Sequence, residues 1–153
     1  MFLSTTKLNI IGPKKEIDGV SILGPVRKYN QVEVSATDAR TLGANAPLRE
    51  SGDIKGSAPI KIVNPETGAE LDLEEGLIVA KRHIHMHPTD AEEFGVKNGD
   101  IVSVSVNSGK GRNIIFGDVG IRVSDSFRLA MHIDTDESNA GLCFGTVYGD
   151  LIK

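Results

Sequence analysis

The sequence is poor in the residues that mark disulfide-rich or membrane-spanning proteins. It has one cysteine in 153 residues, no tryptophan, and only 5% aromatic residues. A single cysteine excludes an internal disulfide, and a reducing cytosol is the simplest compartment for such a chain. No apolar run approaches the roughly 20 residues that a membrane-spanning helix needs. Residues 1–4 are too short for a signal peptide, so we expect a cytoplasmic protein without membrane partners.

Basic residues are also too few for a general nucleic-acid-binding protein. Seventeen Lys and Arg residues stand against 21 Asp and Glu residues, which gives a formal net charge of −4. Such a balance argues against nucleic-acid partners, although a local basic patch remains open. The hydrophobic fraction of 39% suits one domain of ordinary size, or two small ones that share a core.

The chain does contain many short β-branched runs separated by glycine and proline. The clearest alternation of apolar and polar residues covers residues 101–106, and runs of this kind indicate a barrel or sandwich of short strands. The strands are expected at residues 8–11, 20–23, 31–35, 60–63, 77–80, 101–106, 114–116 and 119–123. Short helices are expected at residues 37–43 and 89–95, with Thr or Asp as N-cap and Gly at the end, and a third near Thr135. Residues 43–58 form the longest irregular segment, which favours a functional loop.

The sequence contains an internal repeat. The pattern Thr-Asp-Ala-x-x-Leu-Gly at residues 37–43 returns at residues 89–95 with Phe in place of Leu, an offset of 52 residues. The same offset places Gln31 opposite His83 and Glu33 opposite His85. In a strand, residues two apart lie on one face. Residues 132–136 are a weaker third copy. We therefore expect a pseudo-symmetric β protein, with chance or ordinary helix capping as the alternative.

Histidines are the residues that most clearly carry chemistry. His83, His85 and His87 form an H-x-H-x-H pattern, and His132 stands apart. Alternate histidines on a strand place their imidazoles on one face, a spacing that suits a divalent metal such as zinc. His87 precedes Pro88 and is the least certain ligand. The alternatives are a polar strand face and a histidine cluster that binds phosphate.

Other side chains could complete such a site. Glu33 could add a carboxylate to two histidines, a ligand set that leaves one metal position open; the alternative is an exposed carboxylate on a strand. Arg27, Arg49 and Arg82 are candidates for binding an oxyanion, because a guanidinium matches a phosphate with two parallel hydrogen bonds. The alternative for each arginine is a solvated surface residue. Cys143 is flanked by apolar residues, which favours a small buried side chain over a nucleophile.

Four segments in this order resemble the PduL-type phosphate propanoyltransferases, the phosphotransacylases associated with bacterial microcompartments. The segments are GPVRKYNQVE at residues 24–33, RESG at residues 49–52, RHIHM at residues 82–86 and HIDTDESNA at residues 132–140. The resemblance runs from about residue 8 to residue 141. It implies two small β-barrel domains with short capping helices, which we expect at residues 1–78 and 79–153 with strands interchanged between them.

The resemblance also implies a reaction, cofactors and site residues. Propanoyl-CoA or acetyl-CoA and orthophosphate would exchange to acyl phosphate and CoA at zinc, as in propanediol degradation. Zinc would be bound by the residues that match family ligands: Glu33, His83 and His85 for one ion and His132 for a second. Arg27 matches the catalytic arginine that binds phosphate. Gln31, Ser51 and Asn139 match residues that contact substrate.

The sequence departs from this family at one point. Family members have a further strand of the form R-H-x-H before the segment that starts here near Leu8, and it supplies two histidines to the second metal. Here no histidine precedes His83. The chain is then a truncated form, or a partner or second copy supplies the strand, or one zinc suffices. The same missing region carries the encapsulation peptide of microcompartment members, so a microcompartment is the alternative location.

Three other functions compete with the enzyme. A degenerate member of the family would bind metal or phosphate without turnover, and the missing histidine strand favours this reading. A metal hydrolase on a similar barrel would rest only on the His and Glu ligands. A purely structural barrel would leave the H-x-H-x-H pattern without a purpose. The sequence predicts a mainly β zinc protein that transfers an acyl group, with the non-catalytic member as the alternative.

Overall fold

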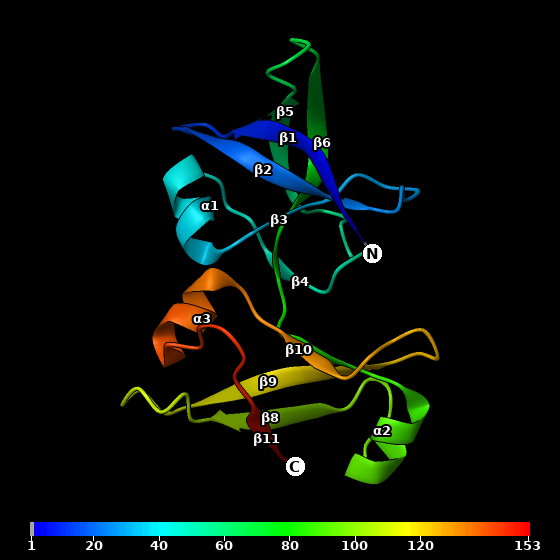
Figure 1. Cartoon of the computed structure of the whole chain (residues 1–153). Helices are drawn as coiled ribbons and strands as arrows, with labels where there is room; N and C mark the ends of the chain where they lie inside the picture. The colour runs from blue at the N-terminus through cyan, green and yellow to red at the C-terminus, as the bar shows by residue number, and fades with distance from the viewer. Residues whose placement is uncertain (1) are drawn as a thin grey trace. The chain divides into compact units, whose positions relative to one another are not determined.

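The computed structural model describes residues 2–153 and divides the chain into two compact units. The first unit ends at Ala80, and the second comprises Lys81–Lys153. Each unit contains its own curved sheet and its own core (Figure 1). Strands outweigh helices in both, so the predicted mainly β class is confirmed. The predicted division at residue 78, with strands interchanged between barrels, stays a prediction. Within residues 2–153, every helix is too short and too polar to cross a membrane.

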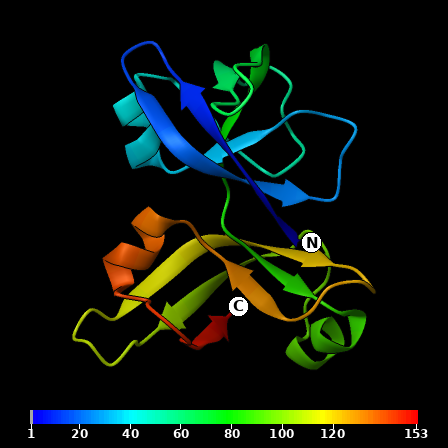
Figure 2. The same cartoon turned by 45° about the horizontal axis from the view of Figure 1, so that its top comes forward.

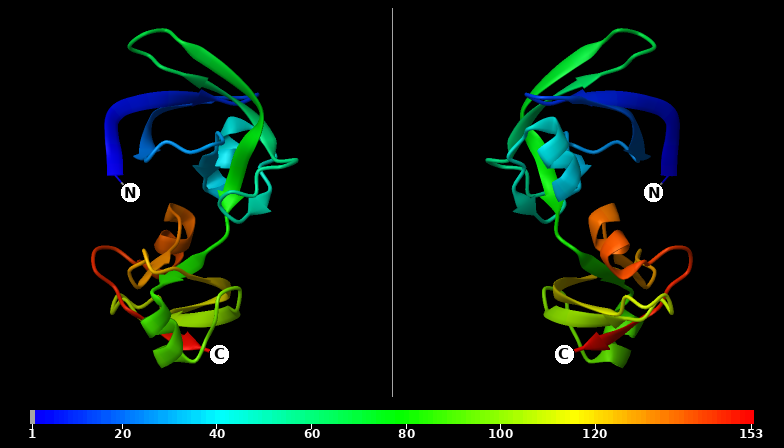
Figure 3. Two further views of the ribbon diagram at one scale, coloured as in Figure 1. Left: turned by 90° about the vertical axis from the view of Figure 1, so that its right-hand side faces the viewer. Right: turned by 90° about the vertical axis from the view of Figure 1, so that its left-hand side faces the viewer.

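The first unit is a curled sheet with one helix. Its elements in chain order are β1 (Phe2–Ile11), β2 (Glu16–Gly24), β3 (Val32–Val34), α1 (Ala36–Leu42), β4 (Leu48–Arg49), β5 (Ala58–Val63) and β6 (Glu70–Ala80). The strand order is β2-β1-β5-β6-β3, with β4 also paired to β6. Both β3 and β4 run parallel to β6, whereas the other pairs are antiparallel. Figure 3 shows how strongly the β1–β2 and β5–β6 ribbons bend.

The second unit repeats this plan with a different strand order. Its elements are β7 (His83–Met86), α2 (Pro88–Phe94), β8 (Ile101–Val106), β9 (Ile114–Val123), β10 (Ala130–His132), α3 (Thr135–Gly141) and β11 (Gly149–Ile152). The order in the sheet is β10-β7-β9-β8-β11. Helices α2 and α3 lie at opposite ends of this sheet (Figure 2). Strand β7 therefore lies between β10, which it meets antiparallel, and β9, which it meets parallel.

Two strands expected in the second sheet are one continuous strand. The sequence predicts two strands at residues 114–116 and 119–123, but they form the single strand β9. The pairing of β8 with β9 shifts between Val102 and Val104, and Asp118 has a φ of 50°. A bulge of this kind absorbs one extra residue while the strand continues. The Gly117–Asp118 dipeptide therefore bends the strand instead of ending it.

Side chains along strand β7 alternate between a face buried in the core and a face that carries the histidines. Ile84 and Met86 of β7 are buried, and they pack with residues of β8 and β9 in the core of the second unit. Because successive side chains of a strand point to opposite faces, His83 and His85 lie on the face away from this core. The first unit has a separate core, in which Leu42 of α1 is fully buried.

The predicted repeat is visible in the hydrogen bonds of the first two helices. The amides of Ala39 and Ala91 donate to the carbonyls of Ser35 and His87, respectively, which are the N-caps of α1 and α2. Both helices end at a left-handed glycine, as predicted for Gly43 and Gly95. The third helix follows the same plan from Asp134 to Leu142. Equivalent bonds at the 52-residue offset show that the repeat is structural.

Two predicted N-caps are wrong. The sequence assigns them to Thr or Asp at the starts of residues 37–43 and 89–95, but the N-cap of α1 is Ser35 and that of α2 is His87. Proline disfavours helical geometry in the residue before it, and it is well suited to the first helical position. Pro88 therefore begins the helix and leaves His87 extended, with Asp90 completing a capping box.

Candidate functional site

Three of the four histidines converge on one face of the second sheet. The register of the antiparallel pair β7–β10 places His132 directly opposite His83, and His85 lies two residues along β7. The ring centroids are 4.8 Å apart for His83 and His85, 5.0 Å for His83 and His132, and 4.3 Å for His85 and His132. One nitrogen from each ring lies within 4.8 Å of the others. We call these three residues the histidine cluster.

The surroundings of the cluster orient two of its rings. The His83 Nδ1 lies 2.9 Å from the carbonyl oxygen of Lys81. Because a carbonyl can only accept, Nδ1 is the donor, and in the neutral ring this tautomer leaves the lone pair on Nε2. A backbone carbonyl in this position is typical of metal-binding histidines. The His85 ring stacks on Phe127, with centroids 4.0 Å apart and an interplanar angle of 8°.

Burial and nearby charges favour the neutral form of two rings in the cluster, His85 and His132. The pKa of His85 is lowered from its ordinary value of 6.5 to about 4, first by burial and then by the nearby His132, His83 and Arg122. The pKa of His132 is lowered first by partial burial and then by His83 and Arg122. A lowered pKa favours the neutral imidazole in both residues. Neutral imidazole is the form that coordinates a metal.

The cluster fits a zinc ion by donor type and by separation. Zinc takes neutral imidazoles, and a tetrahedral ion with ordinary bond lengths separates its ligand nitrogens by about 3.3 Å. The separations within 4.8 Å are wider, and small rotations of the rings would close a difference of this size; His132 is exposed, and His83 and His85 are partly buried. Three histidines leave one position of a four-coordinate metal for water or substrate.

The predicted residues of the first unit gather around Gln31. Its amide nitrogen donates to Glu33 Oε1 at 2.9 Å and to Ser51 Oγ at 3.0 Å, and its amide oxygen accepts from the backbone of Gly52 at 2.7 Å. Gln31 therefore joins the start of the edge strand β3 to Ser51 and Gly52, which lie between β4 and β5 in the segment that the sequence predicted to be irregular. Glu33 belongs to the first unit and the histidine cluster to the second, so Glu33 as a metal ligand stays a prediction.

Arg27 extends this group along the β2–β3 connection. Its guanidinium is exposed and donates to the hydroxyl of Tyr29 at 3.4 Å. The hydroxyl of Tyr29 in turn lies 3.4 Å from the point where Gly52 would carry a Cβ. Tyr29 is a contact that sequence reasoning missed, because an aromatic residue in a loop gives no signal by itself. Its neighbours in the RKYNQ segment place it beside residues that were predicted.

The other candidate residues have structural partners. His87 caps α2 and contacts Thr89, so it lies outside the cluster. Arg49 donates to the carbonyl of Lys55 and forms an ion pair with Asp53 at 3.5 Å.

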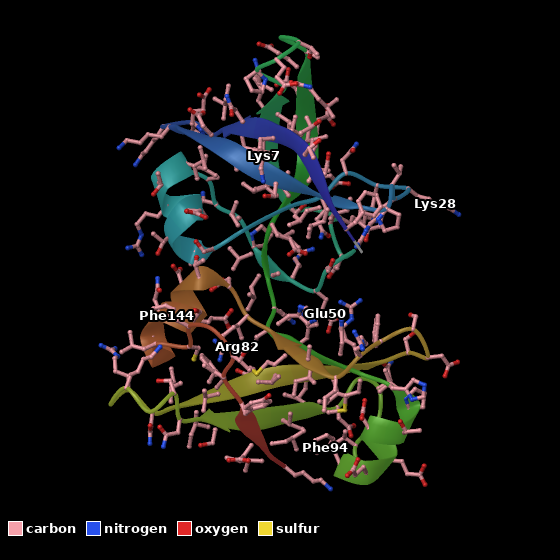
Figure 4. All side chains as sticks on the ribbon, viewed as in Figure 1. Lys7, Lys28, Glu50, Arg82, Phe94 and Phe144 are labelled. Atoms are coloured by element: carbon pink, nitrogen blue, oxygen red, sulfur yellow. The ribbon has the colours of Figure 1, made fainter. Side chains whose placement is uncertain are left out.

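Arg82 is engaged within the second unit. The guanidinium of Arg82, which is labelled in Figure 4, binds the carboxylate of Glu137, donates to the carbonyl of Gly117 and lies over the ring of Phe116. Burial raises the pKa of Glu137, while the Asp134 backbone and Arg82 oppose that shift. The Arg82–Glu137 pair ties α3 to the start of β7.

Asn139 lies exposed on α3, and its role in substrate binding stays a prediction. Cys143 is partly buried against the core of this unit.

A hollow of about 420 Å³ in the first unit contains none of the predicted site residues. It is lined by small and apolar residues: Pro13, Gly43, Ala44, Asn45, Pro47, Gly56, Ser57, Ala58 and Pro59. A lining without acid, base or metal ligand cannot carry the chemistry that the histidine cluster offers. The candidate site is therefore assigned to the cluster and to the Gln31 group, each within its own unit.

Comparison with known proteins gives one consistent family. The model of a family described as phosphate propanoyltransferase matches residues 1–143. The chain is 59% identical over 140 residues to the phosphate propanoyltransferase of Lachnoclostridium phytofermentans, which covers 91% of this chain and 64% of that protein. Identity to the protein of the same name from Citrobacter koseri is 57% over 133 residues, covering 87% of this chain and 62% of that one. Identity to the phosphate propanoyltransferase of Thermotoga maritima is 54% over 135 residues, which covers 88% of this chain and 63% of that protein. The chain spans less than two thirds of the length of these relatives.

Proposed function

Since the chain belongs to the phosphate propanoyltransferase family, we propose that it exchanges CoA and orthophosphate on an acyl group at a zinc site. Propanoyl-CoA or acetyl-CoA and phosphate would give acyl phosphate and CoA. The observation that carries this proposal is the convergence of His83, His85 and His132, whose ligand atoms lie within 4.8 Å of one another. A zinc ion bound there would supply a Lewis acid for a thioester carbonyl or a phosphate oxygen.

The proposed reaction makes one bond and breaks one. A phosphate oxygen bonds to the carbonyl carbon of the thioester, the carbon–sulfur bond breaks, and CoA leaves as a thiolate. Phosphate carries negative charge into this step, so a positioned cation lowers the barrier. Arg27 matches the arginine of the family for this role, and its guanidinium can hold two phosphate oxygens at once. The exchange requires no acyl group on the protein itself.

The remaining residues have binding roles in this proposal. Gln31, which already orders Ser51 and Glu33 through its amide, would present these polar groups to the substrate. Glu33 would act as a further zinc ligand. Asn139 would contact the substrate from the second unit. These roles rest on the match to the family motifs.

The decisive experiment is the release of CoA thiol from propanoyl-CoA and acetyl-CoA by this chain, followed with a thiol reagent, with and without phosphate and zinc. We expect release that needs both phosphate and zinc. The variant His83→Ala should release none, because it removes a metal ligand. The matched control is His87→Ala. It also replaces a histidine, but one that caps α2 and lies outside the cluster, so turnover should be kept.

Each alternative result of this experiment would support a competing function or remove the metal site from the reaction. Release that proceeds without phosphate would identify a thioester hydrolase. A chain that binds zinc at the histidine cluster but releases no CoA would be a non-catalytic member of the family. Activity that survives His83→Ala would remove the metal site from the reaction.

Association with a bacterial microcompartment is a separate part of the proposal. It rests on the resemblance to microcompartment-associated members of the family, as does a role in propanediol degradation. Co-sedimentation of the chain with purified shells would support it, and recovery only in the unbound fraction would contradict it.

A further inference from the structure

The second sheet places an arginine beside the histidine cluster. In the parallel pair β7–β9, Arg122 is the direct partner of His85. Paired residues on neighbouring strands share a face of the sheet, and residues next to each other in one strand do not. Ile121 of β9 is buried in the core, so Arg122 lies on the opposite face, together with the cluster.

The charge of Arg122 is not neutralised by the protein. Arg122 is a partly buried residue, and within residues 2–153 its side chain forms no ion pair and no hydrogen bond. Its charge nevertheless acts on two members of the cluster, since it contributes to the lowered pKa of both His85 and His132. An arginine has five N–H donors. Here all of them remain available to a ligand.

The sheet also leaves room beside this arginine. Gly120 lies two residues before Arg122 on β9, on the same face, and it is the partner of His83. A Cβ at Gly120 would meet no atom closer than 4.0 Å, and that atom is the carbonyl oxygen of Arg82. The space in front of Gly120 is therefore bordered by His83 of β7, Ile101 of β8 and Arg122, and no side chain of β9 fills it.

We propose that Arg122 binds the phosphoryl oxygens of a ligand next to the metal held by the histidine cluster. The inference deepens the proposed function and rests on it for the identity of the metal and the anion. It adds an anion-binding residue on the second unit to Arg27 on the first. The chemistry recognised is a phosphoryl group, which orthophosphate and the phosphates of CoA both offer.

This arrangement has a thermodynamic consequence that can be measured without turnover. A fixed positive charge beside the cluster repels a divalent cation that binds alone. An anion that contacts both the arginine and the metal removes this repulsion. Zinc and phosphate should therefore strengthen each other's binding, and by linkage the effect is equal in both directions.

The test is a zinc titration of the full chain in a chelator buffer, which keeps free zinc too low for zinc phosphate to precipitate. Parallel titrations contain no anion, inorganic phosphate, or desulfo-CoA, which carries the phosphates of CoA without its thiol. In the unaltered chain we expect zinc affinity to rise by about 10-fold with a phosphoryl ligand, within the usual range of coupling between sites. The more effective of the two ligands identifies the source of the phosphoryl group.

Two variants of Arg122 separate charge from geometry. Arg122→Gln should bind zinc more tightly than the unaltered chain when no anion is present, by roughly 2- to 10-fold, because the repulsion is gone. Its gain from phosphate should fall below about 2-fold. Arg122→Lys keeps the charge and so should keep the unaltered affinity for zinc alone. It should lose much of the gain from phosphate, because an ammonium lacks the paired donors of the guanidinium.

Arg112→Gln is the matched control, since it removes the same charge near the start of β9, where the guanidinium donates to the carbonyl of Ala140. It should keep the full gain from phosphate.

Equal gains in the unaltered chain and in both Arg122 variants would overturn the proposal, as would zinc binding that no phosphoryl ligand strengthens. Absence of zinc binding in the unaltered chain would overturn it together with the metal centre. The chain could also show coupling between zinc and phosphate that depends on Arg122 and yet release no CoA. That result would support the anion site and reject only the proposed turnover.

Discussion

Strand periodicity decides which histidines can share a metal. His83 and His85 lie two apart on β7, so their rings emerge on one face, and the pairing with β10 adds His132. His87 continues the same spacing in the sequence, but the strand ends at Met86. Its ring nitrogen then accepts a hydrogen bond from the amide of Thr89 at the start of α2. The H-x-H-x-H pattern thus contains two residues of the cluster and one helix cap.

Replacement of two histidines tests this division of roles. His83→Ala should abolish zinc retention after dialysis, because two imidazoles remain. His87→Ala should retain zinc, while loss of the N-cap lowers the free energy of unfolding by about 0.5–2 kcal/mol. Zinc content by atomic absorption and urea denaturation measure the two effects. Zinc loss in His87→Ala, or retention in His83→Ala, would contradict the assignment.

The histidine cluster also makes stability depend on pH in the metal-free chain. The pKa of His85 is about 4 in the folded state against 6.5 ordinarily. Between these values the unfolded chain binds more protons than the folded chain, so the free energy of unfolding falls as pH decreases from 6.5 to about 4. His132 shifts in the same direction.

Urea midpoints across this pH range, with a chelator present, measure the effect. The variant His85→Gln is the comparison, because it removes the group but leaves the carboxylates that also titrate. Its midpoint should change less with pH than that of the unaltered chain. Equal slopes in the two proteins would show that His85 contributes nothing to the pH dependence.

At the level of secondary-structure elements, the chain uses one strand–helix unit three times. A short strand leads into an N-cap, a seven-residue helix follows, and a left-handed residue ends it. Glycine fills the left-handed position after α1 and α2, whereas Leu142 fills it after α3 with a φ of 50°. A residue with a Cβ is strained in this conformation. Glycine in the first two copies therefore has a structural role, because it ends the helix without this strain.

Gly95→Ala tests this role of glycine. Its φ is 70°, and the added Cβ would meet only the flexible end of Lys153 at close range. The free energy of unfolding should therefore fall by roughly 1–2 kcal/mol, which is the cost of the left-handed conformation for a residue with a Cβ. Gly117→Ala is the control, since its φ is ordinary and its Cβ would lie 4.0 Å from the nearest atom, Ser103 Oγ.

Thermal or urea denaturation of the two alanine variants should show a loss in the first and a change below about 0.5 kcal/mol in the second. Equal changes would mean that backbone strain at Gly95 is not the cause.

At the level of the whole molecule, residues 2–153 contain two cores that share no residue. One contains Leu42 and Leu77 in the first unit, and the other contains Phe116 and Val119 in the second. Apolar burial is the main favourable term in folding. A change in one core should therefore act first on the unit that contains it.

Leu42→Ala tests the independence of the two cores. Leu42 is fully buried, so its truncation should cost about 2–5 kcal/mol of the stability of the first unit. Hydrogen exchange should show lost protection in the strands of that unit and unchanged protection in β7, β8 and β9. Equal loss in both units would show that they unfold as one cooperative structure.

Local interactions explain what the sequence determined by itself. The alternation at residues 101–106, the helix ends at Gly43 and Gly95, and the one-face spacing of His83 and His85 all depend on residues within one turn or strand. These features follow from backbone periodicity and from the conformations that each residue type allows. The mainly β class and the repeat were therefore predictable. The N-cap of α2 was not, because Pro88 moved it to His87.

Only the tertiary structure decided which of these strands became neighbours. Pairing of β10 with β7 brings His132 to His83, and pairing of β9 with β7 brings Arg122 to His85. In sequence, Arg122 is one charged residue among many, and no local pattern distinguishes it. Strand register depends on the packing of a whole face against the core, since a slip of one residue would turn every side chain to the other side. The composition of the site is therefore a property of the sheet, although the residues able to bind a metal could be named from the sequence.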